Sequence, residues 1–355
     1  MRIAKSVQAL TPYTPGEQPR ERNVVKLNTN ENPYPPSPLV AETLASFDLD
    51  RLRRYPDPVF TELRGRIAGL YGTVPERVFV GNGSDEVLTL AARAFVDDDE
   101  AIGAFDPSYS LYRTLAAIRN VPFEPSPLGP DFSWSDPVER CADGRPVALF
   151  LLTNPNAPTS TLHPAERVAA FASGFPGVVL VDEAYADFAD ANCVPLAVAP
   201  SCTNVIVMRT LSKSYSLAGL RLGFCIGPEQ LIEALYKVKD SYNADAVAQA
   251  AASAAISDQP WMLANVAKVK RTRESAAAEL RAMGWDVPPS QTNFLFARPA
   301  HRPAAEIFEA LRARHIYVRY FPGPRTGDRL RITIGTDDDM RTLLDALREL
   351  DRPLA

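Results

Sequence analysis

The sequence contains few of the residues on which metal sites and disulfide frameworks depend. Its three histidines, His163, His301 and His315, lie far apart, and its four cysteines form no CxxC pair. A zinc site needs closely spaced ligands, so we expect no metal site. Cysteines without a pairing pattern in a chain of 355 residues indicate a reducing compartment.

Long apolar runs and an excess of basic residues are also missing. No run approaches the roughly 18 apolar residues of a membrane span, and the N-terminal stretch MRIAKSVQALTPYTPG lacks the apolar core of a signal peptide. The net charge of -5 argues against a nucleic-acid surface, which requires clustered Lys and Arg. These absences predict a cytoplasmic protein whose partners are small molecules, with no nucleic acid and no membrane among them.

Proline, in contrast, is abundant, with 32 residues, and many of them lie between residues 12 and 58. A disordered leader is one interpretation of this region. Apolar anchors in VVKLNTNE favour an ordered arm that lies over the body of the protein.

From about residue 60, apolar runs of strand length alternate with helical segments. The expected strands are RVFVG, AIGAF, VALFLL, VVLVDEAY and VIVMRTLS. Continuous apolar runs between helices favour a mostly parallel sheet covered on both faces, and hence an α/β fold.

After Gly227 the pattern changes to long helices, over 228–256 and around 260–283, followed by the strands NFLFA, YVRYF and LRITIG. This pattern predicts a smaller α+β domain. We therefore divide the chain into an N-terminal arm with the start of the small domain (1–57), a large domain (58–240) and a C-terminal small domain (241–355).

In such sheets ligands bind beyond the carboxyl ends of the strands. Lys213, in TLSKS, follows one expected strand, and Asp182 ends another. Lys213 could simply extend to the surface, and Asp182 could cap a turn. A lysine held in a site, however, can form a Schiff base with a carbonyl cofactor, which also needs an acid beside its pyridine nitrogen and a cradle for its phosphate.

The stretch GNGSDE offers part of such a cradle, because free amides at a helix N-terminus favour a phosphate. A capping turn is the alternative interpretation. A dinucleotide-binding oxidoreductase is a more distant alternative, because Glu86 stands where the third glycine of GxGxxG should be. The candidate phosphate ligands are Gly83, Ser84, Asp85, Thr210, Ser212 and Arg221.

The order of these features resembles the fold-type-I pyridoxal-phosphate aminotransferases, and within them the histidinol-phosphate aminotransferases. The resemblance covers nearly the whole chain and rests on LTPY, KLNTNENPYPPSP, RYPDP, GNGSDE, PNAPTS, VDEAY, RTLSKSYSLAGLRLGF and LRITIGT. It implies a large domain with a mostly parallel seven-stranded sheet between helices, and a smaller α+β domain.

The resemblance also implies roles for individual residues. Lys213 would form the Schiff base with pyridoxal 5'-phosphate and later move the proton, and Asp182 would pair with the pyridinium nitrogen. Tyr185 would bind the phenolic oxygen of the cofactor, and Tyr109 would stack on its ring. Tyr55 would reach the cofactor phosphate of a neighbouring subunit, which implies a homodimer.

For the substrate, Arg331 matches an arginine that binds a carboxylate or a phosphate, and its fork suits either anion. Arg319 could be a surface charge, but together with Tyr13 it favours a phosphate-bearing amine, and Asn30 completes the predicted substrate site. We expect transamination of histidinol phosphate with 2-oxoglutarate, to imidazole-acetol phosphate and glutamate. An aromatic amino-acid aminotransferase and a threonine-phosphate decarboxylase are the alternatives.

The loop TNPNAPTS departs from the family, whose loop reads like PNNPTG. Ala157 stands where the family has the asparagine that binds the phenolic oxygen, and Ser160 stands where the family has a glycine. Asn156 would reach that oxygen only if the turn aimed it inward. Asn156 is therefore the candidate contact, and Asn154 is expected to shape the turn.

Overall fold

The computed structural model describes residues 2–3, 5–8, 10, 16–21 and 23–352. Its largest sheet has seven strands in the order β2-β8-β7-β6-β5-β3-β4. The strands are β2 (Val78–Gly81), β3 (Ala101–Asp106), β4 (Phe123–Pro127), β5 (Val147–Thr153), β6 (Val178–Asp182), β7 (Val205–Thr210) and β8 (Gly223–Ile226). All pairs are parallel except those that β8 makes with β2 and β7.

Apolar side chains on both faces of this sheet are buried, as the continuous apolar runs predicted. In β5, Leu149 and Leu151 belong to one core cluster, while Phe150 and Leu152 belong to another. Alternate residues of a strand point to opposite faces, so helices must cover both. The helices around the sheet are α3 (Thr61–Leu70), α4 (Ser84–Ala94), α5 (Leu111–Arg119), α6 (Ala165–Gly174), α7 (Val194–Val198) and α8 (Glu229–Val238).

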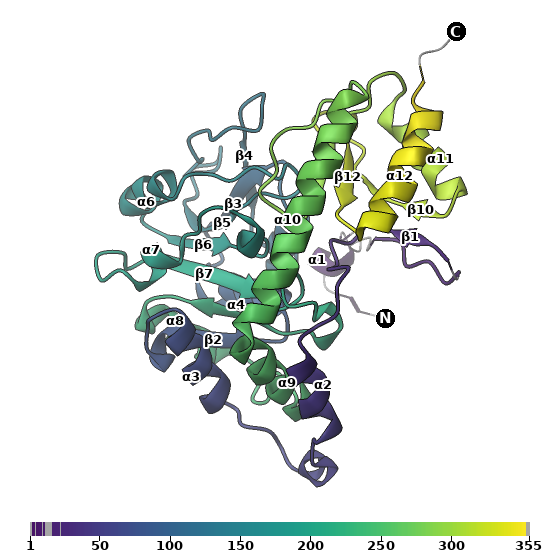
Figure 1. Cartoon of the computed structure of the whole chain (residues 1–355). Coiled ribbons are helices and arrows are strands. Elements are labelled where there is room, and N and C mark those ends of the chain that lie inside the picture. The colour runs from purple at the N-terminus through teal and green to yellow at the C-terminus, as the bar shows by residue number, and fades with distance from the viewer. Residues whose placement is uncertain (1, 4, 9, 11–15, 22, 353–355) are drawn as a thin grey trace.

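A second, smaller group of elements forms from the two ends of the chain (Figure 1). It has a three-stranded antiparallel sheet, β11-β12-β9, and a parallel pair of β1 with β10. Its strands are β1 (Val25–Lys26), β9 (Phe294–Ala297), β10 (Ile316–Tyr317), β11 (Arg319–Tyr320) and β12 (Leu330–Thr333), with the helices α11 (Ala304–Ala313) and α12 (Asp337–Leu350). The predicted α/β fold with a smaller α+β part is confirmed.

The long helix predicted over 228–256 is wrong in one respect, because the chain leaves the helical conformation in the middle. Helix α8 ends at Val238, and α9 (Ala246–Ser257) begins after Asp245, whose side chain accepts a hydrogen bond from the Ala248 amide. An aspartate at an N-cap satisfies amides that a helix start leaves open. Helix α10 (Gln259–Ala282) then runs beside both groups of elements (Figure 1).

The remaining elements are the helices α1 (Lys5–Gln8) and α2 (Pro38–Ala45) and the 3-10 helices η1 (Leu49–Arg53), η2 (Pro75–Arg77), η3 (Ala186–Phe188) and η4 (Ala218–Leu220). Helix α2 lies against α9, which also contacts α3. The domain boundaries at 57/58 and 240/241 remain predictions.

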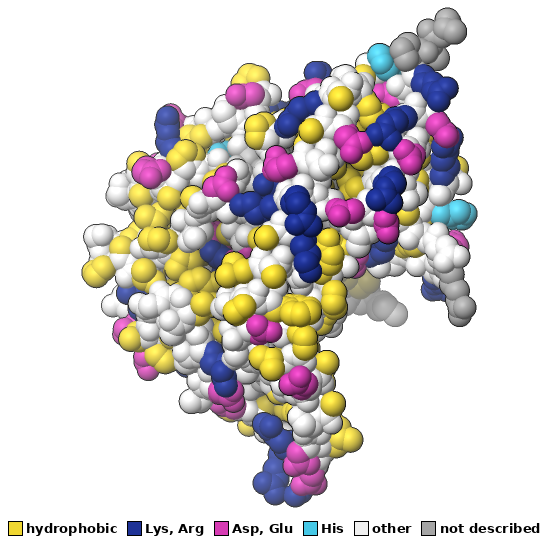
Figure 2. All heavy atoms as spheres, in the orientation of Figure 1, with side chains coloured by type: hydrophobic (Ala, Val, Ile, Leu, Met, Phe, Trp, Pro, Cys, Tyr) yellow, Lys and Arg dark blue, Asp and Glu magenta, His cyan; other side chains and the backbone are white. Residues whose placement is uncertain are grey.

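Basic and acidic side chains are interspersed over α10 and α12 on the face that Figure 2 shows. Of the helices that the structure describes, none has both the length and the hydrophobicity needed to cross a bilayer.

Candidate active site

A cavity of about 500 Å³ lies where the loops after β3, β5, β6 and β7 meet the start of α4 and the residues of β11 and β12. Parallel strands place their carboxyl ends at one edge of a sheet, so loops distant in sequence converge there. The predicted residues that line it are Asn30, Ser84, Asp85, Tyr109, Asp182, Tyr185, Thr210, Ser212, Lys213, Arg221, Arg319 and Arg331.

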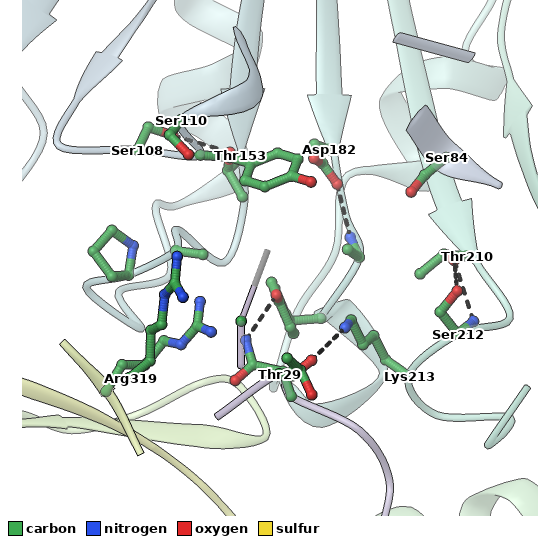
Figure 3. Close-up of a pocket in the computed structure, with 18 of the residues that line it drawn as sticks. Thr29, Ser84, Ser108, Ser110, Thr153, Asp182, Thr210, Ser212, Lys213 and Arg319 are labelled. Carbon is green, nitrogen blue, oxygen red and sulfur yellow. Dashed lines mark hydrogen bonds between the residues drawn. The ribbon is translucent and has the colours of Figure 1, made fainter. Parts of the chain in front are cut away.

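Figure 3 shows how the labelled residues divide the cavity. Ser84, Thr210 and Ser212 lie on one side and Arg319 lies on the other, with Lys213 and Asp182 between them. The residues predicted to bind a phosphate and those predicted to bind the substrate are therefore separated by the residues predicted to be catalytic.

Lys213 follows β7, in a turn that directs its amine into the cavity. Its Nζ donates a hydrogen bond to the backbone oxygen of Thr29 at 3.1 Å and lies 5.9 Å from the centre of the Tyr185 ring. Burial lowers the pKa of this amine to about 8, and the positive charge of Arg331 acts in the same direction. An amine with a lowered pKa is more often neutral near pH 7, which is the state that attacks a carbonyl carbon.

Asp182 ends β6 and is buried at the bottom of the cavity. Its Oδ2 accepts a hydrogen bond from the Tyr112 hydroxyl at 2.8 Å, and its Oδ1 accepts one from the Ala184 amide at 3.1 Å. Burial raises the pKa of Asp182 to about 6, although these two hydrogen bonds act in the opposite direction. The carboxylate is thus ionised at neutral pH, in a position where it would bind a cationic N–H strongly.

Two supporting residues around Asp182 were not predicted. Tyr112 lies on α5, and its hydroxyl is within 2.6 Å of Thr153 Oγ1 as well as bonded to Asp182. A tyrosine hydroxyl needs a partner when it is buried, and Tyr112 is buried. Its place one helical turn after Tyr109, facing the sheet, was the available signal.

Tyr185 and Asn30 meet in the cavity wall. Asn30 Nδ2 donates to the Tyr185 hydroxyl at 2.9 Å, and Asn30 Oδ1 accepts from the Thr333 hydroxyl at 2.9 Å. The two residues are 155 positions apart in sequence. The arm residue Asn30, predicted to bind substrate, is thereby bonded to the predicted ligand of the phenolic oxygen.

The N-terminus of α4 forms one end of the cavity. Its N-cap is Gly83, with φ 78°, which supplies no side-chain hydrogen bond to the first turn. A Cβ on Gly83 would lie 2.7 Å from Arg221 Nη2, so a side chain there would push the guanidinium from its present place, and the positive φ also favours glycine. Arg221 also contacts Asp85 at 3.3 Å. Open amides beside an arginine are a suitable site for an anion.

Three further residues predicted to bind the cofactor, Thr210, Ser212 and Tyr109, lie at the same end of the cavity as the start of α4. Thr210 Oγ1 bonds to Ser212 Oγ at 3.0 Å and accepts from the Ser212 amide at 3.2 Å. The Tyr109 hydroxyl lies 3.5 Å from Asp85 Oδ1, which places the tyrosine at the edge of the cavity next to α4.

Two arginines form the opposite end. Arg319 and Arg331 are directly paired across β11 and β12. Arg331 donates to the backbone oxygen of Asn28 at 2.9 Å, and both guanidiniums lie over the Phe321 ring, at 5.3 Å and 5.2 Å from its centre. Adjacent guanidiniums attract a doubly charged anion. Tyr13, the third predicted residue of this group, lies outside the described residues.

The structure does not bring Asn156 into the cavity, so its predicted contact is corrected. Asn156 is fully buried, donates to the Pro107 backbone oxygen at 3.0 Å and to Thr159 Oγ1 at 2.9 Å, and accepts from the Ser108 hydroxyl at 3.1 Å. The hydrogen bonds of its side-chain amide stabilise the loop. Ala157 faces the cavity instead.

Two other positions in this loop, Asn154 and Ser160, are also buried. Asn154 exchanges two hydrogen bonds with the His163 backbone, which stabilises the turn. Ser160, where the family has glycine, adopts a left-handed φ of 64° and is buried. A serine in this conformation carries strain that a glycine would avoid.

Tyr55 does not line the cavity of its own chain. Its side chain is 78% exposed and stacks on Tyr242, with ring centres 4.3 Å apart.

Comparisons with known proteins agree with this geometry. The family described as "Aminotransferase class I and II" matches residues 22–347. The chain is 44% identical to a histidinol-phosphate aminotransferase of Syntrophotalea carbinolica, over 98% of this chain and 99% of that protein. It is 45% identical to histidinol-phosphate aminotransferase 1 of Bradyrhizobium diazoefficiens, over 97% of each.

A solved structure has the same fold over nearly the same length. It is the histidinol-phosphate aminotransferase of Sinorhizobium meliloti in complex with pyridoxal-5'-phosphate, with a TM-score of 0.87 and 25% identity over 98% of both chains. Given the full-length matches and a cavity at the carboxyl edge of the sheet, the chain belongs to the class I and II aminotransferase family.

Proposed function

We propose that this aminotransferase uses pyridoxal 5'-phosphate to transfer the amino group of histidinol phosphate to 2-oxoglutarate, forming imidazole-acetol phosphate and glutamate. The observation that carries the proposal is the Arg319–Arg331 pair at the end of the cavity opposite α4. The names of the relatives that are 44% and 45% identical to this chain support the same substrate. The pathway would be histidine biosynthesis.

The residues of the cavity fit the proposed cofactor at each of its polar groups. The uncapped start of α4, with Ser84, Ser212 and Arg221, suits a phosphate monoester, and buried Asp182 suits a protonated pyridine nitrogen. Lys213 Nζ would hold the aldehyde carbon as a Schiff base. When bound, the cofactor supplies an electron sink for the pair left on the substrate carbon.

The side chains then have separate tasks. Lys213 Nζ would move the proton from the substrate carbon, and its lowered pKa suits a group that must both accept and return a proton. Asp182 would keep a proton on the pyridine nitrogen. Tyr185, supported by Asn30, would donate to the phenolic oxygen. With Ala157 in the place of the family asparagine, this oxygen would receive one hydrogen bond fewer.

Two alternatives share this chemistry, namely aromatic transamination and decarboxylation of threonine phosphate. The dinucleotide-binding alternative is excluded by the family assignment. Side-by-side rates of the purified enzyme with histidinol phosphate, phenylalanine and threonine phosphate would test the proposal. We expect the highest kcat/KM with histidinol phosphate. A preference for either other substrate would contradict it.

Replacement of Arg319 by alanine is expected to raise the KM for histidinol phosphate by roughly 10- to 150-fold, since a hydrogen bond to a charged group contributes about 1.5–3 kcal/mol. Phenylalanine, which has no phosphate, should lose less. Arg314→Ala, an exposed arginine paired with Glu349, is the matched control. Unchanged kinetics in Arg319→Ala would count against phosphate binding at this end.

We also propose a cytoplasmic homodimer in which Tyr55 completes the site of the partner. The exposed ring of Tyr55 and the exposed side chains of Leu49 and Leu52 on the adjacent η1 support a covered surface here. The four cysteines are free, which agrees with a reducing compartment.

Mixed dimers would test the role of Tyr55. A dimer of one Lys213→Ala chain and one Tyr55→Ala chain should regain activity that each parent lacks, because one site then has both residues intact. If Tyr55 acts within its own chain, both sites of the mixed dimer stay defective and no activity returns. A monomer in size-exclusion chromatography would also refute the arrangement.

A further inference from the structure

Glu31 lines the cavity beside Lys213, and none of the tasks described above uses it. It lies in the segment that follows β1, which also supplies Asn28, Thr29 and Asn30 to the cavity wall. Its side chain is 43% exposed, so it is open to a ligand that enters the cavity.

The contacts of Glu31 hold its carboxylate in the charged form and in a defined place. Lys26 Nζ forms an ion pair with Glu31 Oε2 and also donates to Thr29 Oγ1 at 2.9 Å. Burial raises the pKa of Glu31, but hydrogen bonds with Lys26 and Thr29 and the charge of Lys213 outweigh this effect, so the pKa is lowered overall.

Two of the other acids that line the cavity, Asp85 and Asp182, are bonded to neighbouring residues. Asp85 contacts Arg221 at 3.3 Å, and buried Asp182 accepts from Tyr112 and the Ala184 amide. Asp106 ends β3, and the negative charge of Glu31 is the strongest acidic influence on the pKa of Lys213, ahead of that of Asp85. Glu31 is thus an ordered carboxylate close to the reacting amine.

The charged side chains of the cavity would interact differently with the two ends of the proposed substrate. Its phosphate is an anion, which Arg319 and Arg331 attract and Glu31 repels. Its imidazole ring presents an N–H, and a carboxylate is a strong acceptor for such a donor. Phenylalanine has a ring of similar size without any N–H.

We propose that the Glu31 carboxylate accepts a hydrogen bond from the N–H of the substrate's imidazole ring and thereby selects histidinol phosphate over amines with an apolar ring. This inference rests on the proposed function. An apolar ring in the same place would displace water from the carboxylate without giving it a hydrogen bond in return, so such a substrate would bind less well. Lys26 is a positioning residue in this arrangement, since it pairs with the carboxylate and is not among the residues that line the cavity.

The test compares the half-reactions of wild-type enzyme and Glu31→Gln with histidinol phosphate, glutamate and phenylalanine, followed in single turnovers. We expect kcat/KM for histidinol phosphate to fall about 10- to 150-fold, as for a lost hydrogen bond to a charged group. The loss with glutamate and with phenylalanine should be at least about tenfold smaller. Glu21→Gln, an exposed glutamate of the same arm, is the matched control.

A merely structural effect of Glu31 would act through Thr29 on Lys213, and would slow all three substrates equally. That outcome would overturn the inference, as would unchanged selectivity. Calorimetric binding of histidinol phosphate to Lys213→Ala and to Lys213→Ala/Glu31→Gln gives a readout without turnover, and equal affinities would also overturn it. If the wild-type enzyme itself does not react with histidinol phosphate but does react with glutamate, the proposed function fails first, and the two failures are distinguishable.

Discussion

Replacement of Lys213 by alanine is expected to reduce transamination by about 10⁴-fold, the upper end of what a positioned acid–base group contributes. The variant loses both the amine that would hold the cofactor and the base that would move the substrate proton. Among the described residues that line the cavity, Lys213 supplies the amine, and nearby Lys26 is paired with Glu31.

Single-turnover rates with histidinol phosphate and with glutamate would measure this loss. The wild-type enzyme should be yellow, and borohydride should bleach the band and label Lys213. Lys237→Ala, an exposed lysine on α8, is the matched control. Activity of Lys213→Ala within tenfold of wild type, or a label on a different lysine, would refute the assignment.

Asp182→Asn is expected to lose at least about 100-fold in kcat, within the range of one positioned proton-transfer or charge-stabilising group. An amide cannot hold a proton on a pyridine nitrogen as a carboxylate does, so the ring would be a weaker electron sink. Steady-state kinetics at saturating substrate would show the effect in kcat. Asp338→Asn, at an exposed helix start, is the control. Near wild-type turnover in Asp182→Asn would contradict the role.

Stability provides an independent readout for the same variant. Burial raises the pKa of Asp182 from 3.8 to about 6, so the folded state binds more protons than the unfolded state between these pH values. The free energy of unfolding therefore falls as pH rises through this window, and at pH 7 the carboxylate costs stability. Asp182→Asn should unfold at the same temperature as wild type or higher, while activity is lost. A large drop in the unfolding temperature would indicate a structural role instead.

The strands that end at the site were predictable, because a strand buried on both faces appears in the sequence as a continuous apolar run. VALFLL and VVLVD are continuous apolar runs, and each ends at a polar residue, Thr153 and Asp182, at the same edge of the sheet. The structure pairs Thr153 directly with Asp182. The break between α8 and α9 was missed, because the residues from Lys239 to Asp245 contain no proline or glycine to end a helix.

The contacts between side chains were less predictable, because they join distant parts of the chain. The bond from Lys213 to the Thr29 carbonyl spans 184 positions, and the bond from Tyr112 to Asp182 spans 70. Such contacts depend on the conformations of several loops at once. Hydrophobic periodicity along the chain predicts secondary structure and does not indicate these contacts.

The loop TNPNAPTS shows most clearly what the sequence determines and what depends on the tertiary structure. The sequence alone determined the α/β fold, the family, and the chemical groups available to the site, including the absence of an amide at Ala157. Only the tertiary structure decided that the amide of Asn156 donates to Pro107 and Thr159, and that Asn30, 155 positions away in the N-terminal arm, bonds to Tyr185. The chemical type of a side chain limits the hydrogen bonds that it can form. Which of these bonds it does form depends on the partners that folding brings within about 3 Å.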